Sequence, residues 1–135
     1  MLKTLVVDDS PTIRRMVIAC LREVCDGGFI EAGSGLDALE QLALGPVGLI
    51  ILDLNMPDMH GLEVLSFVRS HDRYRAIPVV VLTTRNDGAS RTAVLDAGAS
   101  LYLTKPFEPR GLATKVRTLL DEQTAKSDAV RRQDA

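Results

Sequence analysis

Near the middle of the chain, residues 47–53 read VGLIILD. The first six residues are apolar or glycine and show no alternation with polar residues, which is typical of a strand buried on both faces in a parallel sheet. The run ends abruptly at the carboxylate of Asp53. It therefore predicts a central parallel strand that delivers an acid to one edge of its sheet.

Apolar runs and helical patterns alternate on both sides of this strand. The other expected strands are residues 2–7, a short strand from residue 29, residues 79–82 and residues 100–103. The expected helices start after Ser10, after Ser34, near Gly61, near Gly88 and at Pro109, with apolar residues spaced three and four apart. Five strand–helix units with short connections predict an α/β fold, a doubly wound five-stranded parallel sheet with five helices on its two faces.

Length and composition fit one ordinary domain. The 135 residues divide into an expected domain at 1–121 and a polar tail at 122–135, a frayed helix end or a disordered segment. A net charge of −2 argues against nucleic acid or a membrane surface as a partner. With no signal peptide or apolar span expected, we place the protein in the cytoplasm, where Cys20 and Cys25 would be reduced structural thiols.

Several polar residues directly follow the expected strands. Asp8 and Asp9 follow the first strand, Asp53 the third, Thr83 the fourth and Lys105 the fifth. Ligands of such sheets bind outside the carboxyl ends of the strands, so these side chains should share one cleft. Two carboxylates about 4 Å apart repel by roughly 4 kcal/mol at an effective dielectric of about 20, and one lysine leaves two of three negative charges uncompensated. Oxygen ligands without histidine or cysteine favour Mg²⁺, Mn²⁺ or Ca²⁺, and Mg²⁺ fits a site with few protein ligands best.

The motifs at these strand ends resemble the receiver domains of bacterial response regulators, and in length the free-standing chemotaxis receivers. They are Asp8-Asp9, Asp53-Leu54-Asn55-Met56-Pro57 with Gly61, Thr83-Thr84 and Lys105-Pro106-Phe107, and the match spans residues 2–120. The resemblance implies a flavodoxin-like strand order, 2-1-3-4-5. It also implies a two-component phosphorelay switch that phosphorylates and dephosphorylates itself, rather than a turnover enzyme.

By this resemblance Asp53 accepts a phosphoryl group from a sensor histidine kinase. Mg²⁺ would be held by Asp53, by the two acids after the first strand, one of them through water, and by the backbone carbonyl of Asn55. Lys105 would pair with a phosphoryl oxygen. The peptide bond between Lys105 and Pro106 is commonly cis in the family.

The resemblance also implies how the signal leaves the site. Thr83 would move to hydrogen-bond a phosphoryl oxygen, and Tyr102 would fill the vacated space. The downstream protein would bind the face formed by the fourth helix, the fifth strand and the fifth helix. Thr84 and Arg85 depart from the simplest family pattern, so we expect both to tune the lifetime of the phosphate.

Each residue also has an ordinary structural interpretation. Asp8 or Asp9 could cap the first helix, Asp53 could be a turn residue, and Tyr102 could be a core aromatic residue. Thr83 and Lys105 could be a strand-end hydroxyl and a surface charge. Four of these features coincide at one sheet edge, and this coincidence favours the functional interpretation: the Asp8-Asp9 pair, Asp53, Thr83 and Lys105.

Three other protein classes were compared with the same pattern. A haloacid-dehalogenase-type phosphatase needs a second acid two residues after its nucleophile, where this chain has Asn55. A flavodoxin needs a phosphate loop after the first strand, where Asp8 and Asp9 would repel the phosphate. A receiver acting only as a passive scaffold is disfavoured by the intact acids, Thr83 and Lys105.

Overall fold

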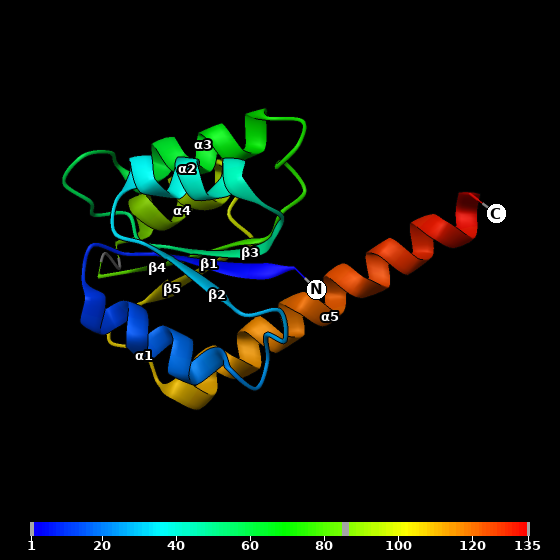
Figure 1. Cartoon of the computed structure of the whole chain (residues 1–135), viewed down its shortest axis with the longest axis horizontal. Coiled ribbons are helices and arrows are strands. Elements are labelled where there is room, and N and C mark those ends of the chain that lie inside the picture. The colour runs from blue at the N-terminus through cyan, green and yellow to red at the C-terminus, as the bar shows by residue number, and fades with distance from the viewer. Residues whose placement is uncertain (1, 85–86, 135) are drawn as a thin grey trace.

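Five parallel strands form one sheet in the order β2-β1-β3-β4-β5, with helices on both faces (Figure 1). The computed structural model describes residues 2–84 and 87–134, with side chains described up to residue 126. The strands are β1 (Lys3–Val7), β2 (Phe29–Ala32), β3 (Val47–Leu52), β4 (Val79–Thr83) and β5 (Leu101–Thr104). The helices are α1 (Pro11–Leu21), α2 (Gly35–Leu44), α3 (Gly61–Ser70), α4 (Gly88–Asp96) and α5 (Pro109–Asp134). The predicted fold class and strand order are confirmed.

The sheet separates two hydrophobic layers. Helices α2, α3 and α4 cover one face, and α1 and α5 cover the other (Figure 1). Consecutive residues of β3 serve opposite faces: Ile50 belongs to the layer under α2, α3 and α4, and Ile51 belongs to the layer under α1 and α5. Both are almost fully buried. The absence of alternation in the sequence of β3 therefore has the predicted cause, burial on both sides.

Serine caps start the first two helices next to the carboxyl ends of their preceding strands. Ser10 Oγ accepts a hydrogen bond from the backbone N–H of Ile13, and Pro11 occupies the first helical position. Ser34 Oγ accepts from the N–H of Asp37. The caps fix where each helix leaves the sheet edge, and so fix the walls of the cleft at that edge.

Helix α5 includes residues 122–134, which were expected to form a polar tail, either a frayed helix end or a disordered segment. It continues without a break from Pro109 to Asp134 and extends well past the sheet (Figure 1). Residues 122–134 contain no glycine or proline and are rich in alanine, glutamine, arginine and other residues that a helix tolerates, so nothing in the sequence stops the helix. Neither α5 nor any other helix in the described part of the chain has the length and apolar character needed to cross a membrane.

Candidate functional site

Backbone hydrogen bonds of the parallel sheet continue one residue past β1, β3 and β5, to Asp8, Asp53 and Lys105. The N–H of Asp53 donates to the carbonyl of Val7 at 3.0 Å, and the N–H of Lys105 donates to the carbonyl of Thr83 at 2.7 Å. Asp53 is thereby held beside the end of β1, where Asp8 begins the next connection. These backbone hydrogen bonds alone place Asp53 and Lys105 at one edge of the sheet, whatever contacts their side chains make.

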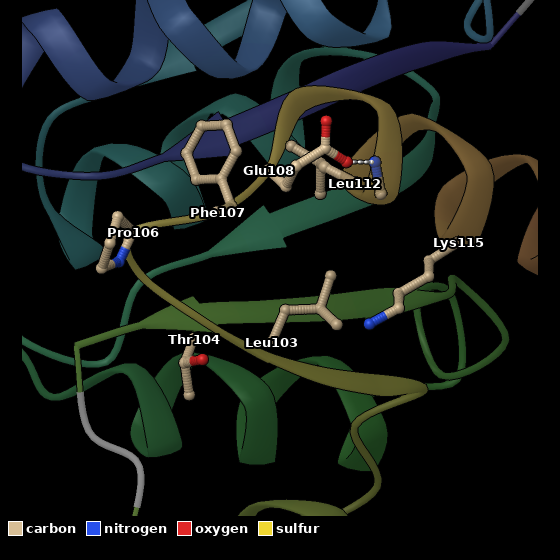
Figure 2. Close-up of a pocket in the computed structure, with 8 residues that line it drawn as sticks. Leu103, Thr104, Pro106, Phe107, Glu108, Leu112 and Lys115 are labelled. Atoms are coloured by element: carbon tan, nitrogen blue, oxygen red, sulfur yellow. Dashed lines mark hydrogen bonds between the residues drawn. The ribbon is translucent and has the colours of Figure 1, made fainter.

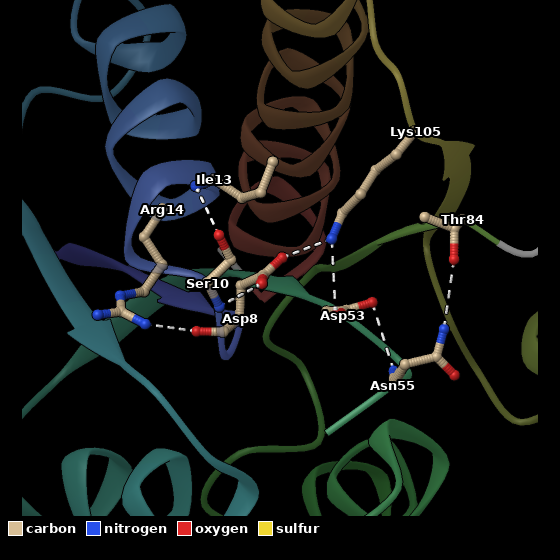
Figure 3. A network of polar contacts seen from close by, with 8 residues as sticks. All are labelled: Asp8, Ser10, Ile13, Arg14, Asp53, Asn55, Thr84 and Lys105. Carbon is tan, nitrogen blue, oxygen red and sulfur yellow. Dashed lines mark hydrogen bonds and ion pairs between the residues drawn. The ribbon is translucent and has the colours of Figure 1, made fainter. Parts of the chain in front are cut away.

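The side chains meet at this edge as a compact polar network (Figure 3). Lys105 Nζ lies 2.6 Å from Asp8 Oδ2 and 3.6 Å from Asp53 Oδ2. Asp8 Oδ1 accepts from the N–H of Ser10 at 2.9 Å. The side chains of Asp8, Asp9 and Asp53 each present a carboxylate oxygen, and these oxygens lie within 4.8 Å of one another. Asp8 and Asp53 are buried, whereas Asp9 is exposed.

The charges in the network do not balance. Three carboxylates and one ammonium group give a sum of −2 if all are ionised. Burial is the main cause that raises the pKa of Asp53 above its ordinary range, and the neighbouring charges of Asp8 and Asp9 raise it further. Lys105 and a backbone N–H act in the opposite direction without cancelling the effect. The favourable interactions of the ionised Asp53 carboxylate with Lys105 and the backbone are therefore too weak to offset its burial and its repulsion from Asp8 and Asp9.

Asn55 lies between the acidic network and the end of β4. Its backbone N–H donates to Asp53 Oδ1, and its side-chain Nδ2 donates to Thr84 Oγ1, both at 3.4 Å (Figure 3). Thr84 is exposed at the mouth of the site, and Thr83 before it is fully buried at the end of β4. Arg85, the other residue expected to tune the phosphate lifetime, lies outside the described residues.

Strand β5 carries Tyr102 three residues before Lys105. Tyr102 is 4% exposed, belongs to the hydrophobic layer under α2, α3 and α4, and has the Arg91 guanidinium 5.8 Å from its ring centroid. This position agrees with the core interpretation, and it is also the inward position that the switch hypothesis assigns to the phosphorylated form. The Lys105–Pro106 peptide bond that follows β5 is cis, as the resemblance implied.

The connection between β3 and α3 is held by contacts that the sequence did not indicate. The Asp58 carboxylate accepts from the N–H groups of Gly35 (3.1 Å) and Leu36 (3.0 Å) at the start of α2, and the hydrogen bond from Leu36 is the main cause that lowers the pKa of Asp58. At the other end of the connection, a Cβ on Gly61 would lie 2.5 Å from the carbonyl oxygen of Asp53. Only glycine allows α3 to begin this close to the backbone that carries Asp53.

Arg14 is a second residue that the sequence did not single out. Its Nη1 donates to the backbone carbonyl of Asp8 at 2.6 Å, and its Nε pairs with Glu31 Oε1 at 3.0 Å (Figure 3 shows the Asp8 contact). Arg15 follows it in the sequence and is exposed. Because Arg14 and Arg15 are consecutive, the sequence does not indicate which of the two side chains contacts the sheet.

The donor set fits a hard divalent cation. It consists of carboxylate oxygens, two of them on buried residues, with no histidine or cysteine in the group. Such ligands suit Mg²⁺ or Mn²⁺, and a cation would offset the negative charge that Lys105 leaves uncompensated. The geometry therefore provides for a metal next to a buried carboxylate, an arrangement suited to reactions of phosphoryl groups.

The chain is similar to known proteins in sequence and in fold. A match to the response regulator receiver domain covers residues 4–117. The chemotaxis protein CheY1 of Helicobacter pylori is 38% identical over 120 residues, 88% of this chain and 97% of that protein.

Solved structures agree with the sequence match. The chemotaxis response regulator CheY4 of Vibrio cholerae has a TM-score of 0.80 at 34% identity, covering 88% of this chain and 98% of that chain. The Mn²⁺-bound form of the response regulator Rcp1 has a TM-score of 0.74 at 30% identity, covering 88% of this chain and 91% of that chain. The chain belongs to the response regulator receiver family, and its relatives include chemotaxis proteins of the CheY type.

Proposed function

We propose that this receiver is a phosphorylation-driven switch in which Asp53 accepts a phosphoryl group from the phosphohistidine of a sensor kinase. The observation that carries the proposal is the meeting of the buried Asp53 carboxylate, the Lys105 ammonium group and two further acids at one sheet edge. No single one of these residues would support it. Together they supply a nucleophile, a cation for the phosphoryl oxygens and ligands for a metal.

The transfer needs little covalent chemistry from the protein. A carboxylate oxygen of Asp53 forms a bond to phosphorus while the bond between phosphorus and the kinase imidazole breaks, and the electron pair leaves with the imidazole nitrogen. Bound Mg²⁺, held by Asp8, Asp9, Asp53 and the backbone carbonyl of Asn55, would neutralise charge on the phosphoryl oxygens. The Mn²⁺-bound Rcp1 structure supports a divalent ion in a related protein.

Lys105 and Thr83 would contact the phosphoryl group after transfer. Lys105 Nζ lies 3.6 Å from Asp53 Oδ2, within reach of a group esterified there. Thr83 ends β4 beside it, bonded through its carbonyl to the Lys105 N–H. The protein itself would then hydrolyse the acyl phosphate, so that it works as a switch that resets rather than as a turnover enzyme. Thr84, bonded to Asn55 at the mouth, would slow that hydrolysis by limiting the approach of water.

The output would be binding of a downstream protein to the face made by α4, β5 and α5. A cavity of about 220 Å³ lies at this part of the molecule, between the connection after β5 and the first turns of α5 (Figure 2). Its lining combines apolar Leu103 and Leu112 with charged Glu108 and Lys115. A lining that mixes apolar and charged side chains suits a protein partner. By analogy with the CheY relatives we place the protein in chemotaxis signalling, and we also propose that it is cytoplasmic.

Asp53 should be the site of phosphorylation. Incubation with acetyl phosphate and Mg²⁺ should add one phosphoryl group to the wild-type protein, read by intact mass, and chelation of Mg²⁺ should abolish the gain. Asp53→Asn should show no gain, because an amide is not a nucleophile here. The matched control is Asp72→Asn, an exposed aspartate after α3 and outside the site, which should still be phosphorylated. Equal phosphorylation of Asp53→Asn, or none of the wild type, would contradict the proposal.

Without metal, Asp53→Asn should increase the free energy of unfolding by about 1 kcal/mol at neutral pH, the scale of one screened charge repulsion. The pKa of Asp53 is raised in the fold, so the folded state binds the proton more tightly and the ionised group costs stability above its folded pKa. The stability difference between variant and wild type should shrink as the pH falls through that pKa toward the ordinary carboxyl range.

Urea denaturation with chelator present measures this difference, and added Mg²⁺ should stabilise the wild type more than Asp53→Asn. A variant less stable than the wild type at neutral pH would show that the carboxylate is not under-compensated.

Replacing Thr84 with alanine should accelerate loss of the phosphoryl group roughly two- to fivefold, less than 1 kcal/mol in barrier height, because water gains access at the mouth. The rate is measured by intact mass after removal of acetyl phosphate. Thr118→Ala, on the exposed surface of α5, is the control and should decay at the wild-type rate. An unaltered rate in Thr84→Ala would remove the steric role of Thr84.

Beryllofluoride with Mg²⁺, a phosphoryl mimic, should shift amide resonances in α4, β5 and α5 as well as at the acidic edge. The physical reason is that charge added at Asp53 biases two arrangements of this region. Asp53→Asn is the control and should show no such shifts. If resonances around Tyr102 stay in place while those at Asp53 move, the proposed route from the site to the output face is wrong.

A further inference from the structure

Arg14 connects helix α1 to the backbone on which the two adjacent acids stand. Arg14 lies in the first turn of α1, and its side chain is only 15% exposed. One guanidinium nitrogen donates to the Asp8 carbonyl at 2.6 Å, and another pairs with Glu31 on β2 at 3.0 Å. A Cβ at Gly33 would lie 3.4 Å from Arg14 Nη1, so the guanidinium packs against the connection after β2.

The contact acts on the peptide unit that joins the two acids. The carbonyl of Asp8 belongs to the plane that also contains the N–H and Cα of Asp9. Fixing that oxygen therefore restricts the rotation that sets the direction of the Asp9 side chain. Asp9 is exposed, so packing restrains its side chain less than it restrains buried Asp8.

Asp8 is itself held at both of its carboxylate oxygens. Oδ1 accepts from the N–H of Ser10, and Oδ2 pairs with Lys105. With Arg14 on the carbonyl, the Asp8 residue is fixed at three oxygen atoms, and the peptide that follows can take few orientations. In the observed one, an Asp9 carboxylate oxygen lies within 4.8 Å of oxygens of Asp8 and Asp53.

We propose that Arg14 is a positioning residue for the divalent cation: by holding the Asp8 carbonyl it aims the Asp9 carboxylate into the acidic cluster. This inference rests on the proposed function, because it presupposes that the cluster binds Mg²⁺. Removal of a group that hydrogen-bonds to a metal ligand and orients it commonly lowers metal affinity by about 10- to 100-fold.

The direction in which Mg²⁺ affinity changes on replacing Arg14 distinguishes a positioning role from an effect of its positive charge alone. Arg14 is a cation near a cation site, so removal of its charge alone would reduce repulsion and tighten Mg²⁺ binding. Loss of the backbone contact would instead let the Asp8–Asp9 peptide rotate and weaken binding. The two explanations predict changes in opposite directions.

The test is calorimetric titration of the metal-free full chain with MgCl₂ at constant pH, without any phosphodonor. Arg14→Gln should weaken binding about tenfold. Arg15→Gln removes the same charge from the neighbouring exposed position and should bind at least as tightly as the wild type. Glu31→Gln keeps an acceptor for Arg14 Nε and should stay near the wild-type affinity.

Arg14→Lys, which keeps the charge and one donor for the Asp8 carbonyl, should recover part of the affinity. If Arg14→Gln does not fold, as judged by its thermal unfolding without metal, Arg14→Lys compared with Arg15→Lys carries the test, and only the former should bind Mg²⁺ more weakly than the wild type. Unchanged or tighter binding by the folded Arg14 variants overturns the positioning role. Absence of Mg²⁺ binding by the wild type would instead reject the proposed function itself.

Discussion

Repulsion among carboxylates at the carboxyl edge of the sheet is the constraint on which the rest of the site depends. Asp8 and Asp53 are buried within reach of each other and of Asp9, with Lys105 as the cation that bridges the first two. One lysine offsets part of the repulsion and leaves a net negative charge on a cluster in which Asp8 and Asp53 are buried. A divalent cation can complete this balance, whereas a phosphoryl group on Asp53 adds negative charge beside it. Both changes alter the forces on the segments attached to the edge.

The fold holds that unfavourable cluster in place through elements outside it. Backbone hydrogen bonds between parallel strands position Asp53 and Lys105. The two hydrophobic layers that stabilise the sheet lie on its two faces. Contacts from neighbouring connections then fix the loops: Asp58 binds the start of α2, and Arg14 binds the carbonyl of Asp8. The stability of the core thus offsets the cost of the site.

Sequence patterns predicted the parts of this arrangement that follow from general rules. An unbroken apolar run ending at Asp53 indicates a buried parallel strand, and parallel strands bring their carboxyl ends together, so the acidic edge could be predicted. The contacts of Arg14 and Asp58 could not, because they join segments whose spacing carries no periodic signal. For residues 122–134 the sequence left a frayed helix end and a disordered segment open, because a polar sequence without glycine or proline permits either; in the structure α5 continues to Asp134. The burial of Tyr102 was one of two alternatives that the sequence left open.

The central claim is that the acids at the sheet edge hold a divalent cation beside Asp53. The most direct measurement is anomalous diffraction from crystals of the protein soaked in Mn²⁺, which replaces Mg²⁺ and scatters strongly. The account predicts one strong anomalous peak within bonding distance of carboxylate oxygens of Asp9 and Asp53. Crystals that show no peak at this edge, or that show these side chains turned away from one another into solvent, would contradict it.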